Sequence, residues 1–186
     1  MTTRGLLIIA GMFLGTFAIL FLGKCGYGKL EIYQSIDSLV AHVRQEFPEV
    51  APIDGATLQL YLQQDPPPLL VDIRGEAEYA MSHLPGAISL SSAVAILDHL
   101  EGSEKPVETV LLYGSVGLRS AEIARELAEV SPVRLFHLEG GIFRWANEGG
   151  ELVSASGEPA ARVHPYNSVW GRLLDEEKRG ELEPEP

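Results

Sequence analysis

Hydrophobic residues along the chain form one long unbroken run, then one amphipathic stripe, and then a series of short runs. The long run covers Leu6–Leu22, contains no charged residue, and is bordered by Gly5 and Gly23. At a rise of ~1.5 Å per residue, a helix of this length is near the lower limit for crossing a bilayer. We therefore expect one transmembrane anchor over residues 5–23, which would place the protein at the cell membrane as a single-pass protein.

The alternative for this segment is a cleaved signal peptide. A signal peptide predicts a shorter apolar core and a small-x-small cleavage site, and only the GYG sequence at residues 26–28 resembles such a site. We favour the uncleaved anchor. The Lys and Arg residues on its two sides are too evenly balanced to decide which side of the membrane bears the soluble part.

The amphipathic stripe belongs to residues 24–52, which are expected to form a helix and a linker. Ser35 can cap a helix, because its hydroxyl can accept from the first free amides. Apolar residues then follow at i, i+3, i+4, i+7 and i+11, namely Ile36, Leu39, Val40, Val43 and Phe47. This face is expected to pack on the domain that follows.

From Ile53 onward, short apolar strands alternate with helical patterns. Strands without hydrophobic alternation, as expected where both sheet faces are covered, are predicted at Leu69–Ile73, Val110–Tyr113 and Val133–Leu138. Helices are predicted at Thr57–Gln64, Glu76–Ser82, Ala93–Leu100 and Arg119–Val130. The alternation predicts an α/β fold with a small, mainly parallel sheet and helices on both faces.

Residues 154–186 are expected to form a C-terminal extension with a short helix and an acidic tail. In Val163–Asp175, Tyr166 and Trp170 lie four residues apart and leucines follow, which favours an amphipathic helix. It could dock on its own domain, on a protein partner or on a membrane, and the first is the default. The tail Leu174–Pro186 is highly charged and is expected to be solvated.

Charge and composition exclude several classes of function. The net charge is −12 and no cluster of Lys and Arg exists, so nucleic acid is not an expected partner. The single cysteine, Cys25, cannot form an intramolecular disulfide or a cysteine-based metal cluster, and the five histidines have no metal-ligand spacing. We expect no metal and no cofactor.

Three segments, taken together and in order, resemble the rhodanese family. The first segment consists of VDIR at residues 71–74 and EYAMSHLPGAI at residues 78–88, and the last is LEGGIFRW at residues 138–145. Between them lies LLYGSVGLRS at residues 111–120, which is similar to a strand followed by the C-x-x-G-x-R-S active-site sequence of that family. The resemblance covers residues 53–153 and implies the rhodanese-type fold and a sulfurtransferase ancestry.

The resemblance places Gly114 where an active member of the family has its nucleophilic cysteine. Gly117, Arg119 and Ser120 fall on the motif. The family's reaction stores sulfur as a persulfide on a thiolate, and glycine has no side chain to offer. Ser115 is a poor substitute, because an alcohol ionises less readily than a thiol of pKa ~8.5 and the sequence shows no base with an orienting group beside it.

Two interpretations of the degenerate loop (Gly114, Ser115, Val116, Gly117, Leu118 and Arg119) stay open. It could be an anion pocket, with ligand contacts from Ser115, Gly117, Arg119 and Ser120 at a helix N-terminus. It could instead be an inherited turn in which Gly114 and Gly117 allow positive φ. In either case we expect Arg119 to brace the loop.

Other residues of the motifs are expected to be structural. Asp72 and Arg74 should fix the turn after their strand, and His83 should form a hydrogen bond within its own turn. Trp145 should pack in the core.

The function predicted from the sequence is that of a membrane-anchored, catalytically inactive rhodanese-like domain. It would bind or scaffold a protein partner, or sense a small anion. The alternative is a sulfurtransferase that works with a cysteine supplied by a partner protein.

Overall fold

The computed structural model describes residues 34–182, and from Ser35 onward these residues form one compact unit. The predicted anchor over residues 5–23, Cys25 and the last four residues of the acidic tail lie outside the described residues. Among the residues described, no helix has the length and apolar character needed to cross a membrane.

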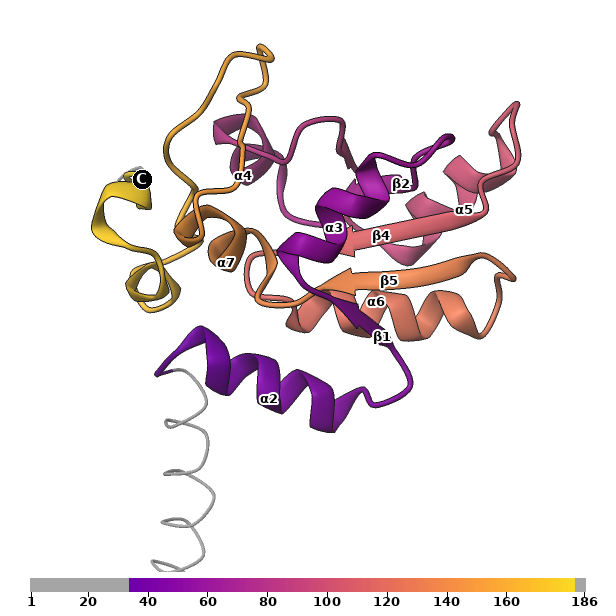
Figure 1. Cartoon of the computed structure of the whole chain (residues 1–186), viewed down its shortest axis with the longest axis horizontal. Helices are drawn as coiled ribbons and strands as arrows, with labels where there is room; N and C mark the ends of the chain where they lie inside the picture. The colour runs from indigo at the N-terminus through magenta and orange to yellow at the C-terminus, as the bar shows by residue number, and fades with distance from the viewer. Residues whose placement is uncertain (1–33, 183–186) are drawn as a thin grey trace, which may run out of the picture. The chain divides into compact units, whose positions relative to one another are not determined.

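A five-stranded sheet with the order β1-β5-β4-β2-β3 forms the centre of this unit, and all of its strand pairs are parallel (Figure 1). The strands are β1 (Ala51–Ile53), β2 (Leu69–Asp72), β3 (Ile88–Ser89), β4 (Thr109–Tyr113) and β5 (Arg134–Leu138). The expected α/β fold with a parallel sheet is confirmed. The sequence pattern missed β1 and β3: β3 is very short, and β1 contains Pro52, which an edge strand tolerates because its N–H side need not be paired.

Six α-helices surround the sheet in the described part of the chain. They are α2 (Ile36–Glu46), α3 (Gly55–Leu62), α4 (Glu76–Met81), α5 (Ala93–Glu101), α6 (Leu118–Ala128) and α7 (Gly141–Asn147). All but α7 were predicted, with small shifts at their ends. Helix α7 was missed because it is short and begins with two glycines in the left-handed region, Gly140 at φ 71 and Gly141 at φ 56.

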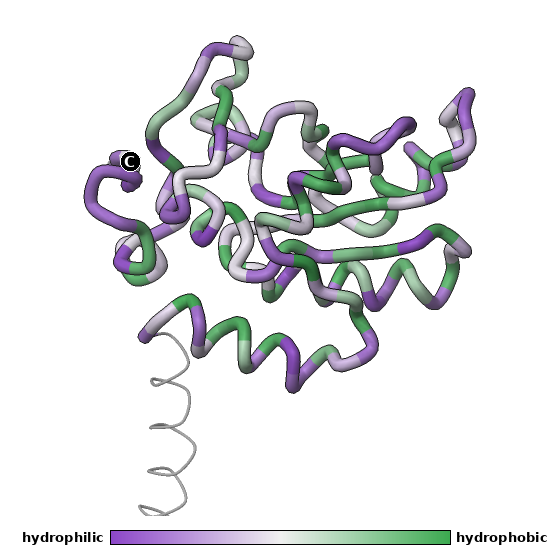
Figure 2. Tube along the Cα trace, viewed as in Figure 1, coloured by the Kyte–Doolittle hydropathy of each residue, from purple (hydrophilic) through white to green (hydrophobic). Residues whose placement is uncertain are grey.

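The sheet is covered on both faces, as predicted. On one face, side chains of α2, α5 and α6 pack against β2 and β4 in a core that includes Val43, Phe47, Val71, Ile96, Leu112 and Leu127. Leu111 and Tyr113 alternate with Leu112 along β4 and therefore point to the other face. Figure 1 shows α3 crossing in front of β4, and Figure 2 shows the hydrophobic character of the strands.

Helix α2 packs on the domain through the predicted stripe. Ser35 forms a capping box with Ser38, and Leu39, Val40 and Val43 are buried. The polar face of the helix is tied down as well: Arg44 Nη2 donates to Glu139 Oε2 at 2.7 Å, and Asp37 is paired with Arg144 in α7. Helix α2 thus packs on the domain that follows it, as expected, and belongs to the same compact unit.

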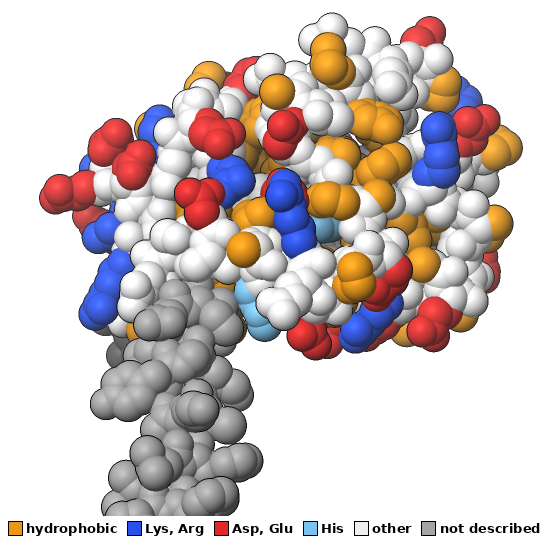
Figure 3. All heavy atoms as spheres, turned by 60° about the horizontal axis from the view of Figure 1, so that its bottom comes forward, with side chains coloured by type: hydrophobic (Ala, Val, Ile, Leu, Met, Phe, Trp, Pro, Cys, Tyr) orange, Lys and Arg blue, Asp and Glu red, His pale blue; other side chains and the backbone are white. Residues whose placement is uncertain are grey.

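The predicted amphipathic helix over Val163–Asp175 is wrong. Only Trp170–Leu173 forms a turn of 3-10 helix, because Pro165 lacks an amide hydrogen and Tyr166 adopts a left-handed conformation at φ 63. The extension nevertheless packs on its own domain, where Asn147 Nδ2 donates to the carbonyl of Leu173. On the face that Figure 3 presents, acidic and basic side chains are interspersed.

One buried histidine in β5 makes stability dependent on pH. His137 is 2% exposed, its Nδ1 has no hydrogen-bond partner within residues 34–182, and burial lowers its pKa to about 4. The unfolded chain binds this proton near pH ~6.5, whereas the folded chain excludes it until the pH is far lower. This contribution to stability is therefore complete above pH ~6.5 and is lost as the pH falls toward ~4.

We expect the free energy of unfolding to fall by about 2 kcal/mol from His137 alone between about pH 7.5 and about pH 5. Urea unfolding of the wild type and of His137→Leu at both pH values measures it. The variant should lose about 2 kcal/mol less than the wild type on acidification. Equal losses of stability in the two proteins would show that His137 has the same pKa in the folded and the unfolded chain.

Candidate functional site

The candidate site is the loop that joins β4 to α6 at the carboxyl end of the central strands. Gly114 directly follows β4, and Gly117 is the N-cap of α6, in the left-handed region at φ 94. A Cβ on Gly117 would lie 3.2 Å from the carbonyl oxygen of Leu138, so this position needs glycine for space as well as for conformation. Gly114 is not among the glycines with positive φ, so the expectation that it serves a turn conformation is wrong.

Helix α7 holds the carbonyl groups of the loop. The amide of Ile142 donates to Gly114 O at 2.9 Å, and the amide of Phe143 donates to Ser115 O at 3.0 Å. Gly141 makes this approach close, since a Cβ there would lie 2.2 Å from Gly114 O. The loop is therefore fixed in conformation by backbone contacts from a helix that is more than twenty residues further along the chain.

The amide groups of the loop are left without partners. No acceptor in residues 34–182 takes the N–H groups of Val116, Gly117, Leu118 or Arg119. These amides lie at the N-terminus of α6, where the helix dipole adds partial positive charge. Such a ring of N–H donors is suited to holding an anion.

A pocket of about 290 Å³ opens over this loop. Its walls are mainly apolar, and they also carry charged groups of both signs. The lining residues are Ile73, Arg74, Glu78, Gly114, Ser115, Val116, Gly117, Leu118, Arg119, Glu122, Tyr166 and Trp170. Of the ligand contacts predicted from the sequence, the pocket brings together Ser115, Gly117 and Arg119.

Ser120, the fourth predicted contact, does not line the pocket. It is fully buried, and its hydroxyl donates to the carbonyl of Gly117 at 3.0 Å within the first turn of α6. Arg119 lines the pocket and also braces it, because its Nη2 donates to the carbonyl of Ser91 at 2.6 Å.

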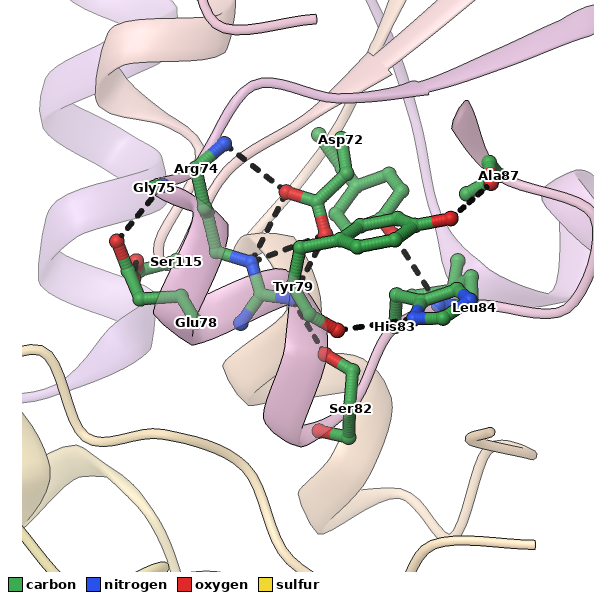
Figure 4. A network of polar contacts seen from close by, with 11 residues as sticks. Asp72, Arg74, Gly75, Glu78, Tyr79, Ser82, His83, Leu84, Ala87 and Ser115 are labelled. Atoms are coloured by element: carbon green, nitrogen blue, oxygen red, sulfur yellow. Dashed lines mark hydrogen bonds and ion pairs between the residues drawn. The ribbon is translucent and has the colours of Figure 1, made fainter. Parts of the chain in front are cut away.

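Glu78 is a member of the site that sequence reasoning missed. Its Oε1 accepts a hydrogen bond from Ser115 Oγ at 3.1 Å, and its Oε2 accepts from the amide of Gly75 at 3.0 Å (Figure 4). The prediction that no base with an orienting group lies beside Ser115 is thus wrong. A carboxylate is nevertheless a weaker base than the imidazole that activates serine in hydrolases, so this pair is a poor nucleophile system.

The turn after β2 places Glu78 and supports the back of the pocket. Asp72 accepts from the backbone amide of Arg74 at 3.0 Å and from its Nη2 at 2.7 Å, as expected for residues that fix a turn. Nη2 of Arg74 also reaches the carbonyl of Ser82 at 2.6 Å. Burial alone would lower the pKa of Arg74, but the hydrogen bonds and charge of Asp72 raise it above its usual value.

One donor group of Arg74 takes no part in this network. The side chain is buried, and its Nη1 has no hydrogen-bond partner within the described residues. Two other structural expectations are met nearby: His83 Nδ1 lies 2.9 Å from the carbonyl of Tyr79 in its own turn, and Trp145 is buried with its Nε1 donating to the carbonyl of Glu151.

The C-terminal extension supplies the aromatic wall of the pocket, which sequence reasoning did not place there. Asn167 Oδ1 accepts from the amides of Val169 and Trp170 at 2.9 and 3.0 Å, and Asn147 Oδ1 accepts from Asp175. These bonds fix the backbone of the segment around Trp170, and both Tyr166 and Trp170 line the pocket. The four-residue spacing of the two aromatics was the available signal, but it indicated a helix rather than a pocket wall.

No group of three or more His, Cys, Asp and Glu side chains within residues 34–182 is arranged to hold a metal ion. The lining of the pocket offers amide donors, two arginines, two glutamates and an aromatic surface.

The two glycines that meet at the loop should respond differently to substitution. We expect Gly114→Ala to change the free energy of unfolding by less than about 1 kcal/mol, because its Cβ would meet only the end of the Ile73 side chain, at 3.2 Å. Gly141→Ala should cost about 3 kcal/mol or more, from its left-handed conformation and its clash with Gly114 O. Denaturant unfolding measures both, and equal losses would contradict this description of the loop.

Comparison with known proteins agrees with the fold and the position of the loop. An uncharacterized protein of Synechocystis sp. is 30% identical over 121 residues, which are 63% of this chain and 64% of that protein. A protein of Allochromatium vinosum named sulfurtransferase is 34% identical over 106 residues, 56% of this chain and 96% of that protein. The chain thus spans slightly less than two thirds of the Synechocystis relative.

Thiosulfate sulfurtransferase from Pseudomonas aeruginosa superposes with a TM-score of 0.53 at 20% identity, over 73% of this chain and 25% of that one, which shows the fold alone. The family model of the rhodanese-like domain matches residues 56–148, half of the chain, and includes β2 to α7 with the whole loop. The chain belongs to the rhodanese-like domain family.

Proposed function

We propose that this protein is a rhodanese-like binding module without sulfur-transfer activity of its own, and that its β4–α6 loop holds an anion. The observation that carries the proposal is Gly114. At the start of a loop with unpaired amide donors, this residue offers no side chain, and the neighbouring Ser115 donates its hydroxyl hydrogen to Glu78. The loop keeps the groups that stabilise an anion and lacks a thiolate that would react with it.

The proposal includes attachment to a membrane. The uncharged run at residues 6–22 supports it through its length and composition. Helix α2 begins at Ile36, so residues 24–35 would be the tether between this segment and the domain.

Restoring a thiol at Gly114 should create activity. In Gly114→Cys, the thiolate would attack the sulfane sulfur of thiosulfate, the S–S bond would break, sulfite would leave, and a persulfide would remain. Cyanide would then take the sulfur as thiocyanate and regenerate the thiolate. Space is available, because the added Cβ would meet the flexible end of Ile73 and no backbone atom.

We expect the wild type to form no thiocyanate above background and Gly114→Cys to turn over, in a thiosulfate:cyanide assay. Gly114→Ser is the matched control, since it adds a side chain of similar size without a thiol, and it should stay silent. Turnover by the wild type would overturn the proposal. Silence of a folded Gly114→Cys would mean that the loop no longer activates a thiol.

A second candidate is sulfur transfer with a cysteine from a partner protein. The relative from Allochromatium vinosum that is named sulfurtransferase supports it, and so does the open pocket beside Gly114. Adding a small thiol such as 2-mercaptoethanol to the wild type in the same assay separates the two. Thiocyanate formation well above that of the thiol alone would favour the shared-cysteine function.

A further inference from the structure

The pocket is larger and more apolar than an inorganic anion requires. Its volume of about 290 Å³ is near the lower end of the range for sites of small organic molecules, and about ten times the ~30 Å³ share of one water. Its apolar walls come from Val116 and Leu118 of the loop and, beyond the loop, from Ile73 and the two aromatics Tyr166 and Trp170. A sulfate-sized ion on the loop amides would leave this apolar surface uncovered.

The aromatic wall belongs to this chain rather than to the family domain. The family model ends at residue 148, whereas Tyr166 and Trp170 lie in the extension. Asn167 and Asn147 fix this segment through hydrogen bonds to its backbone, as described above. The wall is therefore formed before any ligand binds, which reduces the entropy lost on binding.

Tyr166 adopts a backbone conformation that is unfavourable for its residue type. Its φ is 63, a left-handed conformation that is uncommon for a bulky residue, and its amide donates to His164 Nδ1 at 3.0 Å. Asparagine or glycine would adopt this conformation more readily. The position of the tyrosine ring is thus held at a cost in backbone energy.

The anion-binding end of the pocket rests on two separate observations. The amides of Val116 to Arg119, at the N-terminus of an eleven-residue helix, have no acceptor among residues 34–182. In addition, Arg74 lines the pocket, is 2% exposed, and has a buried Nη1 for which the described residues provide no acceptor. The amides can donate to a negatively charged group, and Arg74 adds a positively charged side chain to the wall of the pocket.

The acidic residues of the pocket limit the charge of that group. The positive charge of Arg74 is matched by Asp72, which leaves Arg119 to face Glu78 and Glu122. A dianion at the loop would be repelled by two carboxylates, and a monoanion would be repelled less. The pocket is therefore suited to a singly charged head.

We propose that the pocket binds an organic monoanion with a flat apolar body, such as an arylsulfonate or a related aromatic acid. The charged head would lie on the loop amides, and the body would lie against Trp170 and Tyr166. This inference rests on the proposed function, because it requires that the loop holds an anion.

The test compares two probes, methanesulfonate for the head alone and benzenesulfonate for the head with an aromatic body. Binding of each to the purified full-length protein is followed by ligand-observed NMR, with sulfate as a competitor. We expect benzenesulfonate to bind at least about 10-fold more tightly than methanesulfonate, since stacking on an aromatic surface contributes this much. Sulfate should compete weakly with both.

Two variants assign the gain to the aromatic wall. Trp170→Ala should remove most of the preference for benzenesulfonate over methanesulfonate, and its circular dichroism spectrum and Tm show that the variant is folded. Tyr166→Asn should weaken benzenesulfonate binding while its Tm stays equal or rises, because asparagine tolerates the left-handed backbone. Val169→Ala is the control: Val169 is 55% exposed, adjacent to Trp170, and absent from the lining.

The outcomes distinguish this inference from the proposed function. If both probes bind equally and Trp170→Ala changes neither, the aromatic wall is not a ligand surface and this inference is overturned, while the anion site remains. If neither probe binds, the anion site itself is absent, and both proposals fall.

Discussion

Two backbone hydrogen bonds from α7 determine the form of the whole site. By donating to Gly114 O and Ser115 O, the amides of Ile142 and Phe143 occupy the carbonyl groups of the loop. The amides that follow, at the N-terminus of α6, find no acceptor in the part of the chain that the structure describes. Because α7 follows β5, which pairs with β4, these bonds join the segments that leave two neighbouring strands.

The close approach of the α7 segment to the loop also explains which glycines cannot be replaced by a residue with a side chain. Gly141 and Gly117 lie where a side chain would strike backbone atoms, and both have positive φ. Gly114 is under neither constraint. Its lack of a side chain is therefore a chemical property of the loop and not a requirement of the fold, which is why a cysteine could occupy the position in an active relative.

The fold and the location of the site could be predicted from the sequence because their signals are local. Short apolar runs gave β2, β4 and β5, the cap at Ser35 gave α2, and the motif around Gly117 located the loop. Contacts distant in the chain had no such signal. The bond from Ser115 to Glu78 spans 37 residues, and it forms only because β2 and β4 are neighbours in the sheet.

The aromatic wall is a second case in which tertiary packing was decisive. The spacing of Tyr166 and Trp170 is typical of a helix, yet Pro165 and the left-handed Tyr166 interrupt it, and side-chain amides of Asn167 and Asn147 hold the segment instead. Sequence periodicity cannot predict the conformation of such a segment, because the segment has no repeating secondary structure.

Because positive and negative side chains balance in the pocket, anion binding depends more on the geometry of the N–H donors than on net charge. The protein is strongly acidic, and Glu78 and Glu122 lie in the lining with Arg74 and Arg119. An anion would be held by directed N–H groups rather than by a positive field, as in other backbone nests. Selectivity would then depend on the size and charge of the ligand head.

The central claim is that the loop can hold an anion although Gly114 provides no nucleophile. It is tested most directly by amide NMR of the unit Ser35–Pro186 during titration with methanesulfonate. We predict that the largest shifts occur at the amides of Val116 to Arg119, and that exposed residues at the opposite end of α6, such as Val130, do not respond. Absence of shifts at the loop amides, or shifts spread over the whole surface, would contradict the claim.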